Sequence, residues 1–151
     1  MIRISGGDAR DIAAIMPIMD DAFDPAFGEA WTADQCLSSL ALPYSSLWLA
    51  EYSGKLAAFA ITRWVLDEEE LLMIGVANDF RRKGLGAALI KYVKENASRA
   101  TRTKLFLEVR DGNPAIEFYR RTGFEQIGRR KNYYTGPKNQ QSDAITMKCD
   151  L

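Results

Sequence analysis

One carboxylate lies inside a run of apolar residues that has the composition of a buried strand. The run is Leu105-Phe106-Leu107-Glu108-Val109, and a charge in such a place is costly unless it is paired or hydrogen-bonded. Partial burial raises the pKa of a carboxyl group, which would suit Glu108 to act as a general base. The alternative is a glutamate at a strand end that faces solvent or pairs with a nearby arginine.

A second group of residues has the composition of a phosphate-binding turn. Arg81-Arg82-Lys83-Gly84-Leu85-Gly86-Ala87 lies between a predicted strand and a predicted helix. Free N–H groups at a helix N-terminus attract anions, glycine allows a phosphate close to the backbone, and basic side chains add attraction. A glycine turn with solvated basic residues would look the same. The dinucleotide-binding fingerprint would need a glycine at Leu89, and the Gly-Lys-Ser/Thr of a Walker loop is missing.

The composition limits the chemistry further. The chain has 151 residues and no histidine, so a proton acceptor must be a carboxylate, Tyr, Lys, Cys or water, and we expect no metal site. Its 20 basic and 20 acidic residues balance, which disfavours nucleic acid as a partner. No apolar run approaches the ~20 residues that span a bilayer, and no signal-peptide pattern is present. We therefore expect a cytoplasmic protein without membrane attachment, in which Cys36 and Cys149 are reduced.

The elements that must position these residues alternate along the chain. Strands are predicted at Ile2 to Ile4, Ser46 to Tyr52, Lys55 to Leu66, Leu71 to Val76, Lys104 to Val109, Phe124 to Gly128 and Ala144 to Cys149. Helices are predicted after the caps Asp8 and Thr32, from Leu85, and from Asn113 to Gly123, with Pro17 kinking or splitting the first. This order predicts an α/β fold: one domain over residues 1–151, with a central mixed sheet and helices on both faces.

Three further features allow more than one interpretation. The basic and aromatic tract Arg129-Arg130-Lys131 with Tyr133 and Tyr134 could be a solvated loop, part of a peptide cleft or an RNA-binding surface, and the neutral net charge disfavours the last. The acidic run from Asp67 to Glu70 is predicted to be a solvated turn that could attract a cationic N-terminus. Phe118 and Tyr119, taken alone, indicate core packing.

These segments, in this order, resemble the GNAT superfamily of acyl-CoA N-acetyltransferases, and within it the RimI-type alanine acetyltransferases of ribosomal proteins. The matching pieces are Ile74-Gly75-Val76, the Arg-x-x-Gly-x-Gly turn from Arg81 to Gly86, Leu107-Glu108-Val109-Arg110, Asn113, Phe118-Tyr119 with Gly123-Phe124, and Arg129 to Tyr134. The likeness covers most of the chain from Trp31 on. It implies a central mixed, mostly antiparallel sheet flanked by helices on both faces.

The resemblance also implies roles for individual residues. The CoA pyrophosphate would be held by Arg82, Lys83, Gly84, Leu85, Gly86 and Ala87, and the acetyl and pantetheine arm would be lined by Ile74, Gly75 and Val76, with Asn113 as a further cofactor contact. Glu108 would be the base and Tyr119 the acid. The peptide cleft would be shaped by Trp31, Tyr133 and Tyr134. Between Glu108 and Tyr119 the chain is one residue shorter than the RimI pattern, and we expect the loop at Asp111-Gly112 to absorb this.

The reaction that the resemblance implies is acetyl transfer from acetyl-CoA to the N-terminal α-amine of a protein, in particular a ribosomal protein that begins with alanine. An α-amine, with a pKa near 8, is about one-tenth neutral at pH 7, whereas a lysine amine is neutral in about one molecule per few thousand. A glutamate is therefore a sufficient base. Two alternatives stay open: an acetyltransferase for small-molecule amines, and a non-catalytic CoA-binding sensor. We expect a monomer or a weak dimer.

Overall fold

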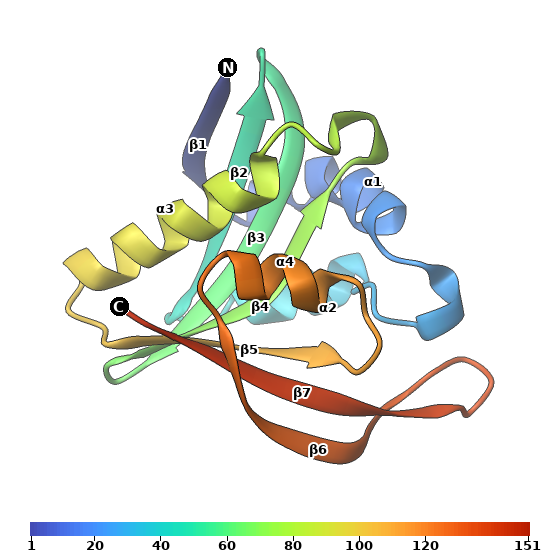
Figure 1. Cartoon of the computed structure of the whole chain (residues 1–151). Helices are drawn as coiled ribbons and strands as arrows, with labels where there is room; N and C mark the ends of the chain where they lie inside the picture. Colours follow the sequence, from blue (N-terminus) through green and yellow to red (C-terminus); the bar gives the residue numbers. More distant parts are fainter.

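Seven strands form one sheet in the computed structural model of the chain, which describes residues 1–151, and their order is β1-β2-β3-β4-β5-β7-β6 (Figure 1). The strands are β1 Ile2–Gly7, β2 Ser45–Tyr52, β3 Lys55–Val65, β4 Glu68–Val76, β5 Lys104–Arg110, β6 Glu125–Thr135 and β7 Gln141–Asp150. Every neighbouring pair is antiparallel except β4 and β5, which run parallel. The predicted mixed, mostly antiparallel sheet is confirmed.

Four α-helices cover the two faces of this sheet (Figure 1). They are α1 Ile12–Ala22, α2 Ala33–Leu40, α3 Leu85–Arg99 and α4 Ala115–Arg121, and short 3-10 turns lie at Ala9–Asp11, Pro25–Phe27 and Asn78–Phe80. The central strand β3 is buried on both sides because its side chains alternate: Phe59 and Ile61 pack with α1 and α2, while Ala58 and Ala60 pack with α3. None of the helices is long and apolar enough to cross a membrane.

The first helical segment differs from its prediction. Asp8 caps the 3-10 turn rather than the α-helix: it accepts a hydrogen bond from the Arg10 N–H at 2.9 Å. The helix α1 then runs unbroken through Pro17. Of the two outcomes predicted for Pro17, a kink or a split, the split is wrong. Proline removes a single backbone hydrogen bond, and the buried residues Ile15 and Met19 on either side hold the helix against the sheet.

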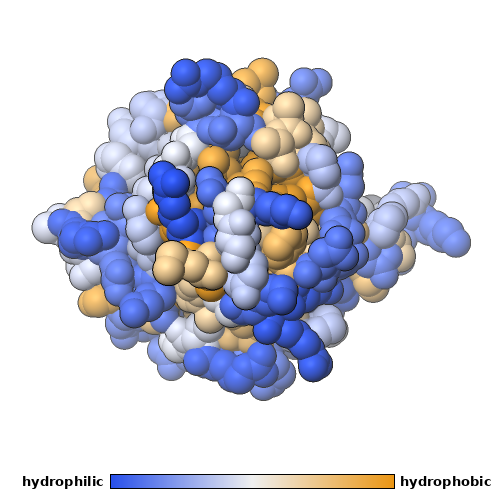
Figure 2. Space-filling view, turned by 90° about the horizontal axis from the view of Figure 1, so that it is seen from above, coloured by the Kyte–Doolittle hydropathy of each residue, from blue (hydrophilic) through white to orange (hydrophobic).

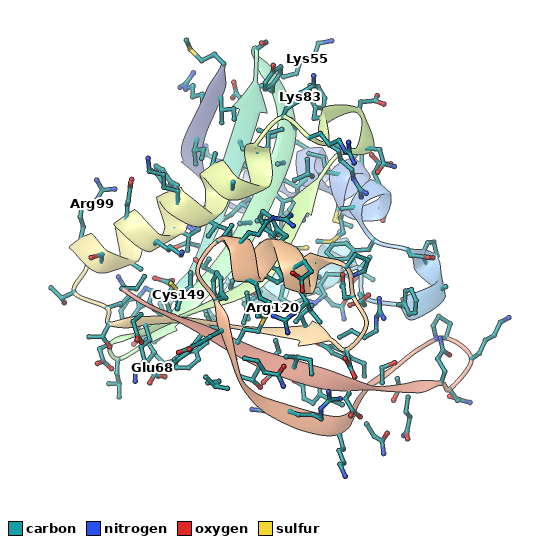
Figure 3. The ribbon with its side chains drawn as sticks, in the orientation of Figure 1. Lys55, Glu68, Lys83, Arg99, Arg120 and Cys149 are labelled. Atoms are coloured by element: carbon teal, nitrogen blue, oxygen red, sulfur yellow. The ribbon has the colours of Figure 1, made fainter.

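The acidic run also differs from its prediction. Glu68–Glu70 is not a solvated turn but the beginning of β4, paired with β3 on one side and with β5 on the other. Glu69 shares a face with the buried Leu71 and lies 3.5 Å from the Arg102 guanidinium. Burial raises the pKa of Glu69, and the neighbouring Arg102 opposes that rise. Glu68 lies at the end of the sheet opposite Lys83 (Figure 3).

The basic and aromatic tract is a strand rather than a solvated loop. It forms part of β6, an edge strand that is exposed along most of its length, and only residues 136–140 connect it to β7. The register shifts between Arg130 and Tyr134, with Asn132 in the left-handed region at φ 54°. Asp143 stabilises this bulge by accepting hydrogen bonds from the Asn132 N–H at 3.0 Å and from Arg129 at 2.8 Å.

Candidate active site

The parallel strands β4 and β5 separate in the middle of the sheet. Their pairing extends from Glu68↔Lys104 to Leu71↔Leu107 and stops there, although β4 continues to Val76 and β5 to Arg110. Beyond this fork, the backbone groups of β4 that face β5 have no strand partner and are available to a ligand. Glu108 is the first residue of β5 past the fork, so the divergence of the strands gives its side chain access to the opening.

A cavity of about 290 Å³ lies at the fork. Of the predicted site residues, it brings together Trp31, Ile74, Glu108, Asn113, Tyr119 and Tyr134, which come from six different segments of the chain. Figure 2 views the molecule from above and shows hydrophobic surface near the centre, surrounded and partly crossed by hydrophilic side chains. An apolar opening with few polar groups is typical of a small-molecule site.

Glu108 has one oxygen paired and one oxygen free. Its Oε1 lies 3.1 Å from Nε of Arg130, whose side chain is 60% exposed. Its Oε2 is buried and has no hydrogen-bond partner in the protein. The arginine pairing that the sequence left as an alternative is therefore present, and it is compatible with a catalytic role. The ion pair occupies Oε1 and leaves Oε2 free to accept a proton.

Tyr119 presents a buried phenol to the cavity. The residue is 9% exposed, and its ring packs edge-on against Phe124 at 5.8 Å between centroids. No protein group hydrogen-bonds to its hydroxyl. Burial, and to a lesser degree the Glu29 carboxylate, raises the pKa of Tyr119 above its ordinary value. The phenol therefore stays protonated across the neutral range, as a proton donor must.

The turn before α3 is open to an anion. Gly84 caps the helix at φ 81°, no side chain caps the first turn, and a Cβ at this position would meet nothing within 4 Å. Arg82 and Lys83 are exposed beside it, and Figure 3 shows Lys83 at the N-terminal end of α3. Free N–H groups, positive side chains and space fit a pyrophosphate. The turn itself does not line the cavity at the fork.

Two glycines of the predicted cofactor site are needed for packing. A Cβ on Gly75 would lie 2.9 Å from the Phe59 ring, and a Cβ on Gly86 would lie 3.1 Å from the Phe118 ring. Gly86 therefore allows α4 to pack closely on α3, with Phe118 as the contact. The prediction that Phe118 is a packing residue agrees with this position.

Asn113 caps the helix that carries Tyr119. Its Oδ1 accepts a hydrogen bond from the Ala115 N–H at 2.9 Å, and the residue also lines the cavity. The side-chain carbonyl is thus committed to the cap, whereas the amide NH₂ can still donate to a ligand. The short loop at Gly112, where φ is 85°, connects β5 to this helix.

The cavity also contains residues that the sequence did not single out, chiefly Glu29. The sequence predicts only a loop from Asp24 to Ala30. In the structure, Glu29 lines the cavity and pairs with Nε of Arg110 at 3.3 Å. The Arg110 guanidinium in turn lies 3.6 Å from the centroid of the Phe27 ring. No local motif reveals a pair whose members are 81 residues apart.

Tyr133 and Tyr134 differ in their placement. Tyr134 lines the cavity, and burial, followed by the Glu108 and Glu29 carboxylates, raises its pKa. Tyr133 is 52% exposed, lies outside the cavity and packs edge-on against Tyr134 at 5.1 Å. Only Tyr134 of this pair can contact a substrate at the fork directly.

Comparison with known proteins assigns this site to a family. Residues 12–124 match the acetyltransferase (GNAT) family. The Escherichia coli K12 ribosomal protein bS18-alanine N-acetyltransferase is 38% identical over 152 residues, which cover 100% of this chain and 99% of that protein. The corresponding Haemophilus influenzae enzyme is 35% identical over 109 residues, 72% of this chain and 73% of that one. A crystal structure of the ribosomal-protein-S18-alanine N-acetyltransferase from Escherichia coli superposes with a TM-score of 0.88 at 34% identity, covering 100% and 94% of the two chains.

The chain belongs to the GNAT family of acetyltransferases. It is an acetyl-CoA-dependent N-acetyltransferase, so the predicted superfamily, fold and cofactor are confirmed, and the non-catalytic sensor is set aside.

Proposed function

We propose that this enzyme acetylates the N-terminal α-amine of a protein, and that the substrate is a ribosomal protein that begins with alanine. The observation that carries the proposal is the buried, unpartnered Oε2 of Glu108 at the fork, in one cavity with the protonated phenol of Tyr119. The similarity to the bS18-alanine enzymes over the full chain supports this acceptor. Ribosomal proteins are made in the cytoplasm, so the proposal places the reaction there.

The roles of the cofactor-binding residues are part of the proposal. The N–H groups of Leu85, Gly86 and Ala87, with the side chains of Arg82 and Lys83, hold the pyrophosphate of acetyl-CoA. The free edge of β4 from Ile74 to Val76 orients the pantetheine arm. When bound, acetyl-CoA supplies an activated acyl group as a thioester. An N–H group near Val76 stabilises the negative charge that develops on the thioester oxygen, an effect worth about 3 kcal/mol per donor.

The proton transfers require two residues. Glu108 Oε2 accepts the proton that leaves the amine, directly or through one water molecule, while Arg130 holds the carboxylate in place through Oε1. Tyr119 donates a proton to the departing sulfur. A thiol has a pKa of about 8.5, so the thiolate is a moderately good leaving group even without a proton. Loss of the acid should therefore slow the reaction less than loss of the base.

The experiment that tests the acceptor is competition between amines. The purified enzyme is given acetyl-CoA with an alanine-initiated peptide that also contains a lysine, together with a panel of polyamines, aminoglycosides and amino acids. We expect mass spectrometry to locate acetyl on the N-terminal residue of the peptide. Preferential acetylation of the lysine or of a panel member would overturn the proposal.

Loss of the phenol should have a smaller effect than loss of the base. For Tyr119→Phe we expect kcat to fall about ten- to hundredfold, at or below the lower end of the usual range for an acid–base residue. The fold should persist because the hydroxyl has no hydrogen-bond partner to lose. Steady-state kinetics and a thermal melt check both parts, and an unchanged kcat would remove Tyr119 as the acid.

The pH profile should show no loss of activity from the phenol below about pH 10. The rate should rise as the amine deprotonates near pH 8. A proton donor fails only above its own pKa, and burial and Glu29 raise the pKa of Tyr119 beyond the ordinary tyrosine value. We therefore expect no descending limb in kcat, measured at saturating peptide, between about pH 8.5 and 10. A descending limb in that window that disappears in Tyr119→Phe would contradict the raised pKa.

A further inference from the structure

Two carboxylates face the cavity at the fork, and the reaction described above uses only one of them. Glu108 comes from β5, and Glu29 comes from the segment between α1 and α2. Both residues line this cavity together with Tyr134. A second acidic group in a largely apolar opening is costly unless it has a partner.

Arg110, the partner of Glu29, contacts only one of the two carboxylate oxygens of Glu29. Arg110 approaches only Oε1, at 3.3 Å, and the side chains of the two residues are 16% and 11% exposed. Arg110 is itself held in place: its Nη1 donates to the Asp111 carbonyl at 3.3 Å, and its guanidinium lies over Phe27. Oε2 of Glu29 has no hydrogen-bond partner in the protein. A fixed carboxylate with one free oxygen on a cavity wall can accept a hydrogen bond from a cation.

We propose that Glu29 is a specificity-determining residue that binds the protonated α-ammonium group of the peptide substrate and selects it against neutral chain ends. The inference rests on the proposed function and deepens it. At pH 7 about nine-tenths of α-amines are protonated, so Glu29 recognises the predominant form of the substrate. Glu108 then removes the proton for the transfer.

The same anchor favours release of the product. Acetylation converts the ammonium group into a neutral amide, which cannot form the charge-assisted hydrogen bond to Glu29 Oε2. The acetylated peptide should therefore bind more weakly than its precursor by about the factor that Glu29 contributes. The hydrogen bond to Glu29 thus explains two preferences: for the substrate over the acetylated product, and for a charged chain end over a neutral one.

The test measures binding without turnover. The enzyme is saturated with CoA, which carries no acetyl group, and titrated at about pH 7 with two peptides. One begins with alanine, and the other begins with propionyl, which is the same residue without its amine. We expect the parent enzyme to prefer the amine peptide, and Glu29→Gln to reduce that preference roughly ten- to hundredfold. Affinity for the propionyl peptide should stay within about twofold.

Two control variants keep the outcomes distinct. Glu117→Gln removes an exposed α4 carboxylate and should leave the preference intact. If Glu29→Gln unfolds because Arg110 is left unpaired, the double variant Glu29→Gln/Arg110→Gln removes both charges and should show the same loss of preference. An intact preference, or equal weakening of both peptides, would overturn the inference. If the parent enzyme binds neither peptide and, when given acetyl-CoA, does not acetylate the alanine-initiated peptide, it is the proposed function that fails.

Discussion

Glu108→Gln should lower kcat/KM for an alanine-initiated peptide by about 10²–10⁴-fold, the range expected for loss of a general base. Glutamine keeps the size of the side chain and can still accept a hydrogen bond from Arg130, which lies 3.1 Å from Oε1. It cannot accept a proton at the position of Oε2. The loss should therefore appear in the chemical step, while the KM for acetyl-CoA stays within a few-fold.

A matched variant shows whether the effect belongs to this position. Glu125→Gln removes a carboxylate that is 68% exposed on β6 and away from the cavity, and its kinetics should equal those of the parent. Raising the pH should partly restore Glu108→Gln, because a larger fraction of the amine is then already neutral. Near-equal rates for Glu108→Gln and the parent would remove Glu108 as the base.

Ala87→Glu should raise the KM for acetyl-CoA at least about hundredfold. Ala87 is exposed in the first turn of α3, and a carboxylate there would lie beside the proposed pyrophosphate position. Two like charges about 4–5 Å apart at a protein surface repel by about 3–4 kcal/mol, which corresponds to more than a hundredfold in affinity. Stability should be unchanged or slightly higher, because acidic residues near a helix N-terminus are favourable by about 0.3–1 kcal/mol.

Ala87→Gln separates charge from size. The glutamine side chain has nearly the same volume and no charge, so the KM for acetyl-CoA should rise about tenfold or less. Thermal melts of both variants should match that of the parent, which checks that the fold is intact. Equal KM increases in the two variants would assign the effect to side-chain volume. An unchanged KM in Ala87→Glu would show that the cofactor phosphates do not bind at this turn.

Features specified by neighbouring residues could be predicted from the sequence. The cap of α2 is one: Thr32 Oγ1 accepts from the Gln35 N–H at 3.1 Å, and Gln35 Oε1 accepts from the Thr32 N–H at 2.8 Å. The cap at Asn113 is another. In each case the side chain and the backbone group that it satisfies are two or three residues apart, so a short window contains the whole interaction.

Features that depend on distant partners could not be predicted in this way. Glu69 can be part of a buried strand only because Arg102 comes from a different segment to pair with it. The polar edge strand β6 lacks apolar alternation because most of its side chains face solvent. Glu29 belongs to the cavity because of Arg110, far along the chain. The resemblance predicted that Glu108 and Tyr119 act together, and both residues line the cavity, whereas the fork that opens it is visible only in the strand register.

Calorimetric titration of CoA into the parent enzyme and into Ala87→Glu tests the central claim most directly. That claim is that the open N-terminus of α3 holds the pyrophosphate and so brings the thioester to the fork beside Glu108. We expect the parent to bind one CoA per chain and the folded variant to bind at least about a hundredfold more weakly. Equal CoA affinities in the two folded proteins would contradict the claim.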